Sequence, residues 1–227
     1  MIILLKTGNI GEALLPLEID FFGSLSSPYC YLALDRLDEI ERDQDIRIVM
    51  RPVLPGVLRM SDFWTDTPKM ELAYFETDVA RTAEFLGVPY DHPNPSPVDW
   101  DEEGVWKPRP DQGLTYRLYN MLYQAEGFSK SYDLYSSLMR LIWSGQTSKW
   151  DAGNHLASCL EGCGLPANLF EQSDVLTKQA ESHFASNQQA LFNCGHWGVP
   201  TFSFNDEPFF GQDRLDQLRW RIENSTV

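Results

Sequence analysis

The sequence is short of basic residues and of long apolar runs, and each shortage excludes a class of function. Its 18 Lys and Arg residues stand against 33 Asp and Glu residues, for a formal net charge of -15. A chain this acidic is repelled by nucleic acid and by anionic lipid surfaces, so neither is an expected partner. No run of about 18 apolar residues occurs, and we therefore expect no membrane-spanning helix.

Cysteine is also scarce, with four residues that show no disulfide framework. The stretch Met1 to Lys6 is apolar but lacks the basic-then-apolar order of a secretory signal. Both features favour a reducing compartment, and we expect a cytoplasmic protein. His155, Cys159 and Cys163 share one predicted helix face, but no C-x-x-C pair accompanies them, so we predict no metal site.

The two ends of the chain predict a mixed α/β sheet. A bulky, aromatic strand over Leu17–Ser24 is followed by a helix from Pro28 and a second strand over residues 45–54. A crossover helix between two strands makes them parallel. Residues 199–204 and 207–212 have the pattern of an antiparallel hairpin. We therefore expect the order β-α-β at one end of the chain and β-β-α at the other.

Between these ends the sequence is helical. Residues 67–87 and 114–163 carry apolar residues at helical spacing, the second stretch being interrupted at Gly127 and Gly145. Another helix, either continuous or broken, is expected from near Pro166 to Leu191. This pattern predicts a helical subdomain that sits on the sheet.

The same pattern divides the chain into parts. A closing helix is expected over residues 213–222, with Asp213 as its cap. The predicted division is a sheet domain over residues 17–60 and 194–227, a helical insertion over 61–193 and an N-terminal extension over 1–16.

The segment Ser27-Pro28-Tyr29-Cys30 has the spacing of a C-x-x-C redox motif, with serine in place of the first cysteine. Serine before proline is a favoured way to begin a helix, so Ser27 is either a helix cap or a group that acts on a ligand. Ser26 is the alternative for the second role. Cys30 lies one turn further on, and it is either a small buried residue or a redox thiol.

Three separated blocks of the sequence resemble one family. SPYCYLALDRL begins at Ser27, WGVPT opens the hairpin, and FGQDRL leads into the closing helix. Together they resemble the 2-hydroxychromene-2-carboxylate isomerases and their relatives, the kappa-class glutathione transferases, in the DsbA-like branch of the thioredoxin superfamily. The resemblance implies a thioredoxin-like mixed sheet with a large all-helical insertion subdomain. Cys30 departs from that family, which has serine at this position.

The resemblance also implies a function, a cofactor and an assembly. It implies a homodimeric, glutathione-dependent isomerase or transferase that acts on a small aromatic electrophile. The Ser27 hydroxyl would stabilise the glutathione thiolate, because a donor beside the positive end of a helix favours the charged form of a thiol. The resemblance also implies a cis peptide bond between Val199 and Pro200, which would turn the backbone of Val199 toward the cysteinyl part of glutathione. The residues that the resemblance assigns to glutathione are Val199, Pro200, Gln212, Asp213 and Arg214.

Other functions stay open at this point. The S-x-x-C spacing favours a thiol–disulfide oxidoreductase that reacts through Cys30. The acidic, proline-rich residues 91–110 favour a non-catalytic thioredoxin-fold protein whose helical block binds a partner. For any small ligand we expect a binding loop at residues 51–60, because loops that follow strand ends bind ligands in α/β folds.

Overall fold

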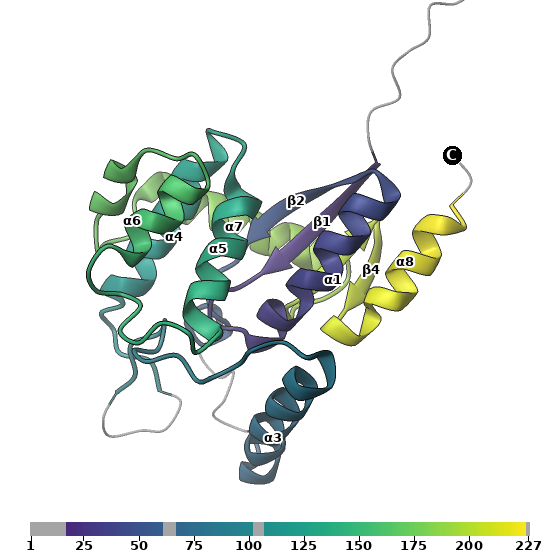
Figure 1. Cartoon of the computed structure of the whole chain (residues 1–227), viewed down its shortest axis with the longest axis horizontal. Coiled ribbons are helices and arrows are strands. Elements are labelled where there is room, and N and C mark those ends of the chain that lie inside the picture. Colours follow the sequence, from purple (N-terminus) through teal and green to yellow (C-terminus); the bar gives the residue numbers. More distant parts are fainter. Residues whose placement is uncertain (1–16, 61–66, 102–106, 226–227) are drawn as a thin grey trace, which may run out of the picture.

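A computed structural model of the chain describes residues 17–60, 67–101 and 107–225, and the predicted extension over residues 1–16 lies outside these ranges. Helices fill most of the described chain (Figure 1). They are α1 (Pro28–Gln44), α2 (Gly56–Arg59), α3 (Lys69–Leu86), α4 (Gly113–Glu126), α5 (Ser131–Trp143), α6 (His155–Gly162), α7 (Lys178–Asn193) and α8 (Leu215–Glu223), with 3₁₀ turns η1 (Ala167–Glu171) and η2 (Gln212–Arg214).

A four-stranded sheet in the order β2-β1-β3-β4 joins the two ends of the sequence. β1 (Leu17–Gly23) pairs in parallel with β2 (Ile46–Pro52). On its other edge β1 pairs antiparallel with β3 (Thr201–Phe204), which pairs antiparallel with β4 (Glu207–Phe210). The mixed sheet predicted from the order β-α-β and β-β-α is therefore confirmed.

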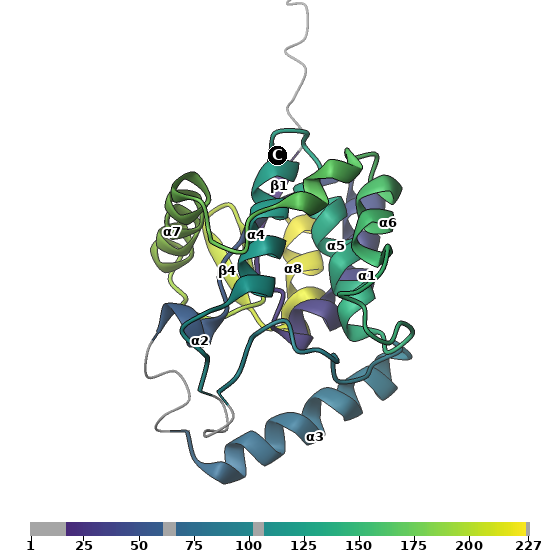
Figure 2. The same cartoon turned by 90° about the vertical axis from the view of Figure 1, so that its left-hand side faces the viewer.

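The two faces of β1 enter different cores, because successive side chains of a strand point to opposite sides. Phe21 is fully buried in the main core, where its ring stacks on Phe202 of β3 with centroids 5.1 Å apart. Phe22 packs instead with Val53 and with Leu191 of α7. The sheet thus separates α7 from α1 and α8, as Figure 2 shows.

α1 begins at the residue that the sequence predicts. Ser27 has an extended backbone, with φ -104° and ψ 111°, and its side chain accepts the Cys30 N–H at 3.4 Å. Pro28 occupies the first helical position, where the missing N–H is not needed. The helix ends at Asp45 in the left-handed conformation. Because α1 follows β1 directly, its N-terminus lies at the carboxyl end of the central strand.

The predicted helical stretch over residues 114–163 is confirmed, with more interruption than expected. α4 and α5 are separated at Gly127, as predicted, but α6 begins only at His155, after an irregular segment that follows Gly145. In residues 67–101 and 107–193 we find no strand, only an isolated bridge between Trp100 and Pro108. The domain boundaries at residues 60 and 193 stay a prediction.

The helix expected from Pro166 is divided into the 3₁₀ turn η1 and α7, which starts at Lys178. The buried side chain of Asn120 donates to Ser173 O at 2.9 Å and to Val175 O at 3.0 Å. These bonds hold the irregular residues between η1 and α7 against α4, so tertiary packing fixes the segment in which the helix is broken.

Asp213 is not the cap of the closing helix, and that prediction is wrong. It lies in η2, and α8 begins at Leu215 without a side-chain cap. The Asp213 carboxylate folds back over Gly211, where an added Cβ would collide with it, and pairs with Arg214 Nη1 at 2.7 Å. Gly211 itself has a positive φ of 102°, a backbone conformation that residues other than glycine rarely adopt. This turn moves the start of the α-helix past Asp213.

α3 lies apart from the other helices and forms one end of the molecule (Figures 1 and 2). It is anchored by Val79 and Ala83, which are buried, while Met70 and Phe85 are more than 80% exposed. Among the helices of the described ranges, none combines the length and the apolar character that crossing a membrane requires.

Candidate functional site

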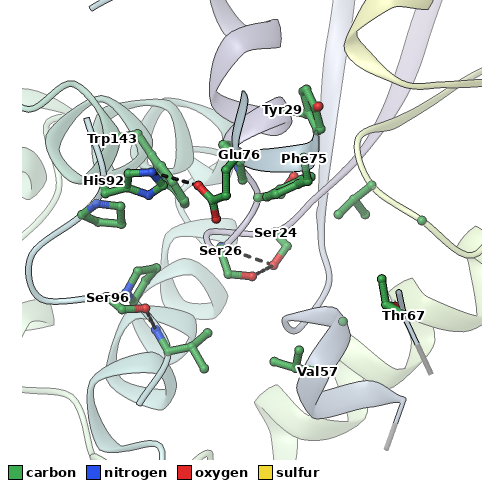
Figure 3. Close-up of a pocket in the computed structure, with 18 of the residues that line it drawn as sticks. Ser24, Ser26, Tyr29, Val57, Thr67, Phe75, Glu76, His92, Ser96 and Trp143 are labelled. Atoms are coloured by element: carbon green, nitrogen blue, oxygen red, sulfur yellow. Dashed lines mark hydrogen bonds and ion pairs between the residues drawn. The ribbon is translucent and has the colours of Figure 1, made fainter. Parts of the chain in front are cut away.

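A cavity of about 570 Å³ lies at the N-terminal end of α1. Its wall is built from the start of α1, from α2, from one side of α3, and from residues near positions 90–100 and 197–199 (Figure 3). A space of this size with aromatic walls suits a small aromatic ligand. The aromatic residues of the wall are Tyr29, Phe75, Tyr90, Trp100, Trp143, Trp197 and Phe210.

Ser27 lines this cavity at the first turn of α1. Its Oγ accepts the Cys30 N–H through a lone pair, which leaves the proton of the hydroxyl to be donated. The neutral Cys30 sulfur is only a weak acceptor for that proton. An anion in the cavity beside Ser27 would therefore receive a hydroxyl donor and the partial positive charge of the helix end.

A buried hydroxyl network holds the loop before α1. Ser24 Oγ lies 3.1 Å from Ser26 Oγ and 3.2 Å from the hydroxyl of Tyr119 in α4. The Tyr119 hydroxyl also donates to Val53 O at 2.6 Å and accepts the Leu25 N–H at 3.3 Å. Ser24 and Tyr119 are at most 1% exposed, and of the three residues Ser24 and Ser26 line the cavity. This network connects one wall of the cavity to a helix 94 residues along the chain.

Cys30 does not line the cavity and is fully buried beneath the start of α1. Burial raises the pKa of its thiol, although hydrogen bonds from Ser27 and Tyr135 and the charge of Arg59 oppose this rise. A thiol with a raised pKa holds little thiolate near neutral pH, and thiolate is the reactive form. The structure therefore favours the interpretation of Cys30 as a core residue.

Arg59, at the end of α2, brings a positive charge to the cavity. Its Nε donates to Leu54 O at 2.7 Å and its Nη2 to Trp197 O at 3.2 Å, which fixes the guanidinium. Burial lowers the pKa of Arg59, but an arginine stays protonated in proteins. Its charge lowers the pKa of the Cys30 thiol, so it also favours an anionic sulfur in the neighbouring cavity.

The peptide bond between Val199 and Pro200 is cis, as the resemblance implies. Val199 lines the cavity, while Pro200 is buried, and Pro200 O accepts the Gly211 N–H at 2.9 Å. Within the described ranges, neither the N–H nor the C=O of Val199 bonds to another backbone group. These two groups can therefore pair with an extended peptide ligand in the manner of an added strand.

Gln212, Asp213 and Arg214 lie in η2, directly after the strand that ends at Phe210, and they do not line this cavity. The Arg36 guanidinium donates to Gln212 O at 2.7 Å and also contacts its side-chain oxygen. Of this block, the structure brings Phe210 to the cavity. The glutathione contacts of the other three residues stay predictions.

The part of the wall that α3 and His92 form carries ionisable groups that the sequence did not single out. His92 Nε2 lies 2.9 Å from Glu76 Oε2, and both side chains line the cavity (Figure 3). The Tyr29 hydroxyl donates to Asp78 Oδ2 at 2.6 Å, and its ring meets Phe75 edge to face. These contacts join α3 to the start of α1 and so complete the wall. Within the described residues, no group of three or more potential ligands is placed to hold a metal ion.

The sequence pattern that defines DSBA-like thioredoxin domains matches residues 18–223 of this chain, nearly all of its described part. The chain belongs to the family of DSBA-like thioredoxin domains. In this DSBA-like domain the cavity lies beside the segment Ser27 to Cys30 and beside the cis peptide bond between Val199 and Pro200.

Individual relatives agree with this assignment. The chain is 25% identical over 207 residues to a 2-hydroxychromene-2-carboxylate isomerase from Sphingobium xenophagum, covering 88% of this chain and 95% of the relative. A solved 2-hydroxychromene-2-carboxylate isomerase superposes with a TM-score of 0.65 at 20% identity, over 91% of this chain and 95% of that one. A probable DsbA oxidoreductase from Streptomyces coelicolor superposes with a TM-score of 0.60 at 16% identity, over 93% and 92% of the two chains. These comparisons show a thioredoxin fold with a helical insertion and a distant similarity to the isomerase.

Sequence reasoning found Ser27 and Val199 on the cavity wall but missed Arg59 and Tyr119. A signal for Arg59 existed, because it falls in the loop over residues 51–60 that was expected to bind a ligand. Tyr119 had no signal, because its helix is remote in sequence and its buried ring follows the ordinary helical pattern.

Proposed function

We propose that this protein is a glutathione-dependent isomerase or transferase that acts on a small aromatic electrophile. The observation that carries the proposal is the position of Ser27, a helix-capping hydroxyl that faces an aromatic-walled cavity with a proton left to donate. Arg59 adds a fixed positive charge close to the same helix start. A thiol has an ordinary pKa of about 8.5, and both groups lower it toward neutral pH.

The glutathione would lie along the cis-proline segment. The backbone N–H and C=O of Val199, which have no backbone partner in the described ranges, would pair with its cysteinyl unit. Gln212, Asp213 and Arg214 would hold its γ-glutamyl end, with the Asp213 carboxylate for the ammonium group. This placement puts the sulfur beside Ser27 and leaves the rest of the cavity to the aromatic substrate.

The chemistry needs no redox step. The thiolate electron pair forms a C–S bond to an electrophilic alkene carbon, and the alkene pair moves onto the conjugated carbonyl oxygen. The former double bond can then rotate. In an isomerase the oxygen pair returns, the C–S bond breaks and the thiolate leaves unchanged. In a transferase the electrophile instead loses a leaving group, and the conjugate is released.

Two measurements test this proposal. Calorimetric titration with millimolar glutathione should show binding and a raised melting temperature, because a ligand that binds only the folded state stabilises it. Addition of 2-hydroxychromene-2-carboxylate should then give isomerisation that depends on glutathione. S-methylglutathione is the control, since it has no ionisable thiol and should bind without turnover. Absence of any heat or melting shift with glutathione would refute the proposal.

The position of Cys30 separates this function from a thiol–disulfide oxidoreductase. Cys30 is fully buried, whereas Cys159, Cys163 and Cys194 are partly exposed. Native alkylation should therefore modify those three residues before Cys30, as mass spectrometry of the digested protein can show. Rapid modification of Cys30 at neutral pH would instead support the oxidoreductase. A reduced thiol cofactor also suits a reducing compartment, so we propose a cytoplasmic location.

A further inference from the structure

The hydroxyl network beneath the cavity has one arrangement of protons in which each of its contacts is a hydrogen bond, and its first member is Tyr119. The Tyr119 oxygen lies 2.6 Å from Val53 O, a distance at which two oxygens must share a proton. Val53 O has none, so Tyr119 donates to it. The two remaining lone pairs of Tyr119 then face Ser24 Oγ at 3.2 Å and the Leu25 N–H at 3.3 Å. Tyr119 is therefore an acceptor toward Ser24.

The direction of hydrogen-bond donation at Tyr119 then fixes the direction at Ser24 and at Ser26. For the contact of 3.2 Å with Tyr119 to be a hydrogen bond, Ser24 donates its single proton to Tyr119, and toward Ser26 it then accepts. It accepts from Ser26 Oγ at 3.1 Å and from Ser26 N at 3.5 Å. Ser24 also lines the cavity, but it is only 1% exposed, so these protein groups cover almost all of it. The Ser26 hydroxyl consequently points its proton away from the cavity and presents lone pairs to it.

The two neighbouring serines on the cavity wall thus have opposite polarity. Ser27 accepts an N–H within its helix and has a proton to donate, whereas Ser26 donates within the loop and has lone pairs to offer. Ser96 resembles Ser27, because its Oγ accepts two N–H groups, at 3.2 Å and 3.0 Å, and keeps its proton. Figure 3 shows Ser26 on the side of Ser24 that is nearer to Ser96 and His92.

The network does not transfer a proton. A relay needs an acceptor that can take up a proton and release it, but this chain of hydroxyls ends at the amide carbonyl of Val53. An amide carbonyl is too weak a base for that task. The network therefore orients the Ser26 oxygen, and a lone pair on the wall selects a ligand that has a hydrogen-bond donor at that point.

We propose that Ser26 is a specificity residue whose Oγ accepts a hydrogen bond from a hydroxyl group of the aromatic ligand. Ser24 and Tyr119 are the positioning residues that hold this polarity. The inference rests on the proposed function for the class of ligand in the cavity. It assigns different partners to the adjacent serines, the glutathione sulfur to Ser27 and the substrate hydroxyl to Ser26.

Two aromatic acids that differ by one hydroxyl group test this assignment. The full chain is titrated calorimetrically with 2-hydroxycinnamate and with cinnamate, in the presence and absence of glutathione. The wild type should bind the hydroxylated acid about fivefold more tightly, the usual effect of one neutral hydrogen bond. In Ser26→Ala the two affinities should become equal, and in Ser26→Thr the preference should return.

Two further variants separate this role from a structural one. Ser27→Gly should weaken the ionisation of bound glutathione but keep the preference for the hydroxylated acid. Tyr119→Phe should reduce that preference although Ser26 is unchanged, because Ser24 no longer has to donate away from Ser26. A variant that merely loosens the fold would lower both affinities together, and melting curves check that each variant is folded.

The outcomes distinguish this inference from the proposed function. The assignment of Ser26 is overturned if the wild type binds 2-hydroxycinnamate no more tightly than cinnamate, or if it binds neither acid. It is also overturned if Ser26→Ala keeps the wild-type preference for 2-hydroxycinnamate. If the preference depends on Ser26 but glutathione does not bind, the proposed function fails and the assignment of Ser26 holds. If glutathione binds and turns over while the preference ignores Ser26, only the assignment of Ser26 fails.

Discussion

Ser27 has two tasks at the residue scale, and different substitutions can separate them. Its Oγ caps α1 by accepting the Cys30 N–H, and its proton is proposed to reach the glutathione sulfur. Glycine is tolerated at a helix N-cap, whereas alanine is not. Replacement of Ser27 by glycine or by alanine removes the hydroxyl in both cases, but only alanine is expected to destabilise the start of α1 substantially.

We predict that Ser27→Ala lowers the free energy of unfolding by about 1 kcal/mol, and that Ser27→Gly lowers it by only a few tenths. Both variants should lose about tenfold or more in glutathione-dependent kcat/KM, because a hydrogen bond to an anionic sulfur is lost. Urea unfolding and steady-state kinetics measure the two effects. If activity followed stability, so that Ser27→Gly kept its rate, Ser27 would be only a cap.

Arg59 acts through its charge, and this gives a pH dependence with a defined sign. A cation lowers the pKa of a nearby thiol, as Arg59 does for Cys30. Arg59→Met should therefore raise the pKa of bound glutathione by about one unit and lower the rate near neutral pH about tenfold. The rate should recover as the pH rises above the new pKa.

Arg59→Lys is the matched control, since it keeps the charge but loses the bond pattern to Leu54 O and Trp197 O. Its pH profile should lie close to that of the wild type. A profile of Arg59→Met that falls equally at every pH would indicate a packing role, and the charge argument would then be wrong.

At the scale of elements, α3 is a weakly embedded part of the cavity wall, anchored by the two buried residues Val79 and Ala83. It carries Glu71, Phe75 and Glu76 to the cavity, yet it stands apart from the other helices (Figure 2). The hydrogen bond from Tyr29 to Asp78 ties it to the start of α1. This bond is also the largest cause that holds the pKa of Asp78 below its ordinary value of 3.8.

The stabilisation by Asp78 follows from the direction of that shift. A carboxyl group whose pKa is lower in the folded state contributes fully above its unfolded pKa, and the contribution is lost as the pH falls through the folded value. We predict that the protection of residues 69–86 against amide hydrogen exchange, taken relative to the intrinsic exchange rate at each pH, falls below pH ~4 in the wild type. Tyr29→Phe should show faster exchange at neutral pH already, with a smaller further change in acid. The remote α6 is the internal control, and equal acceleration there would contradict the prediction.

At the scale of the whole molecule, the net charge of -15 governs association. Two copies of an acidic chain repel each other over a distance that salt shortens. The resemblance implies a homodimer, and we propose one here. The exposed apolar residues Met70 and Phe85 of α3 could take part in such an interface, but the salt dependence does not rely on which face is used.

We predict that dimerisation strengthens as salt is raised from ~20 mM to ~500 mM, where the Debye length falls below ~10 Å. Sedimentation velocity at several protein concentrations measures the dissociation constant at each salt. A sedimentation coefficient of a monomer at all protein concentrations would refute the proposed homodimer. A dimer that weakens with salt would show that opposite charges, and not apolar contacts, hold it together.

Local patterns predicted most of the fold because each rests on neighbouring residues. The strand Leu17–Ser24 and the helix from Pro28 agree with β1 and α1 within a residue. The cap predicted at Asp213 fails because residues elsewhere in the chain hold that turn, with Arg36 donating to Gln212 O and the Gly211 N–H donating to Pro200 O. The break before α7, which the sequence left open, is held by Asn120. Arg59 falls in the loop that was expected to bind a ligand, but only the folded structure places its side chain at the cavity.

By itself the sequence determined the secondary structure, the mixed sheet and the polar start of α1, since spacing and capping act over a few residues. Only the tertiary structure decided which groups surround that start. It brought Tyr119 of α4 and Arg59 of α2 to the serine loop, buried Cys30 and left Ser26 open to the cavity. The bond between Ser24 and Tyr119, 95 residues apart in the chain, sets the polarity of Ser24 and Ser26, and no local pattern carries that information.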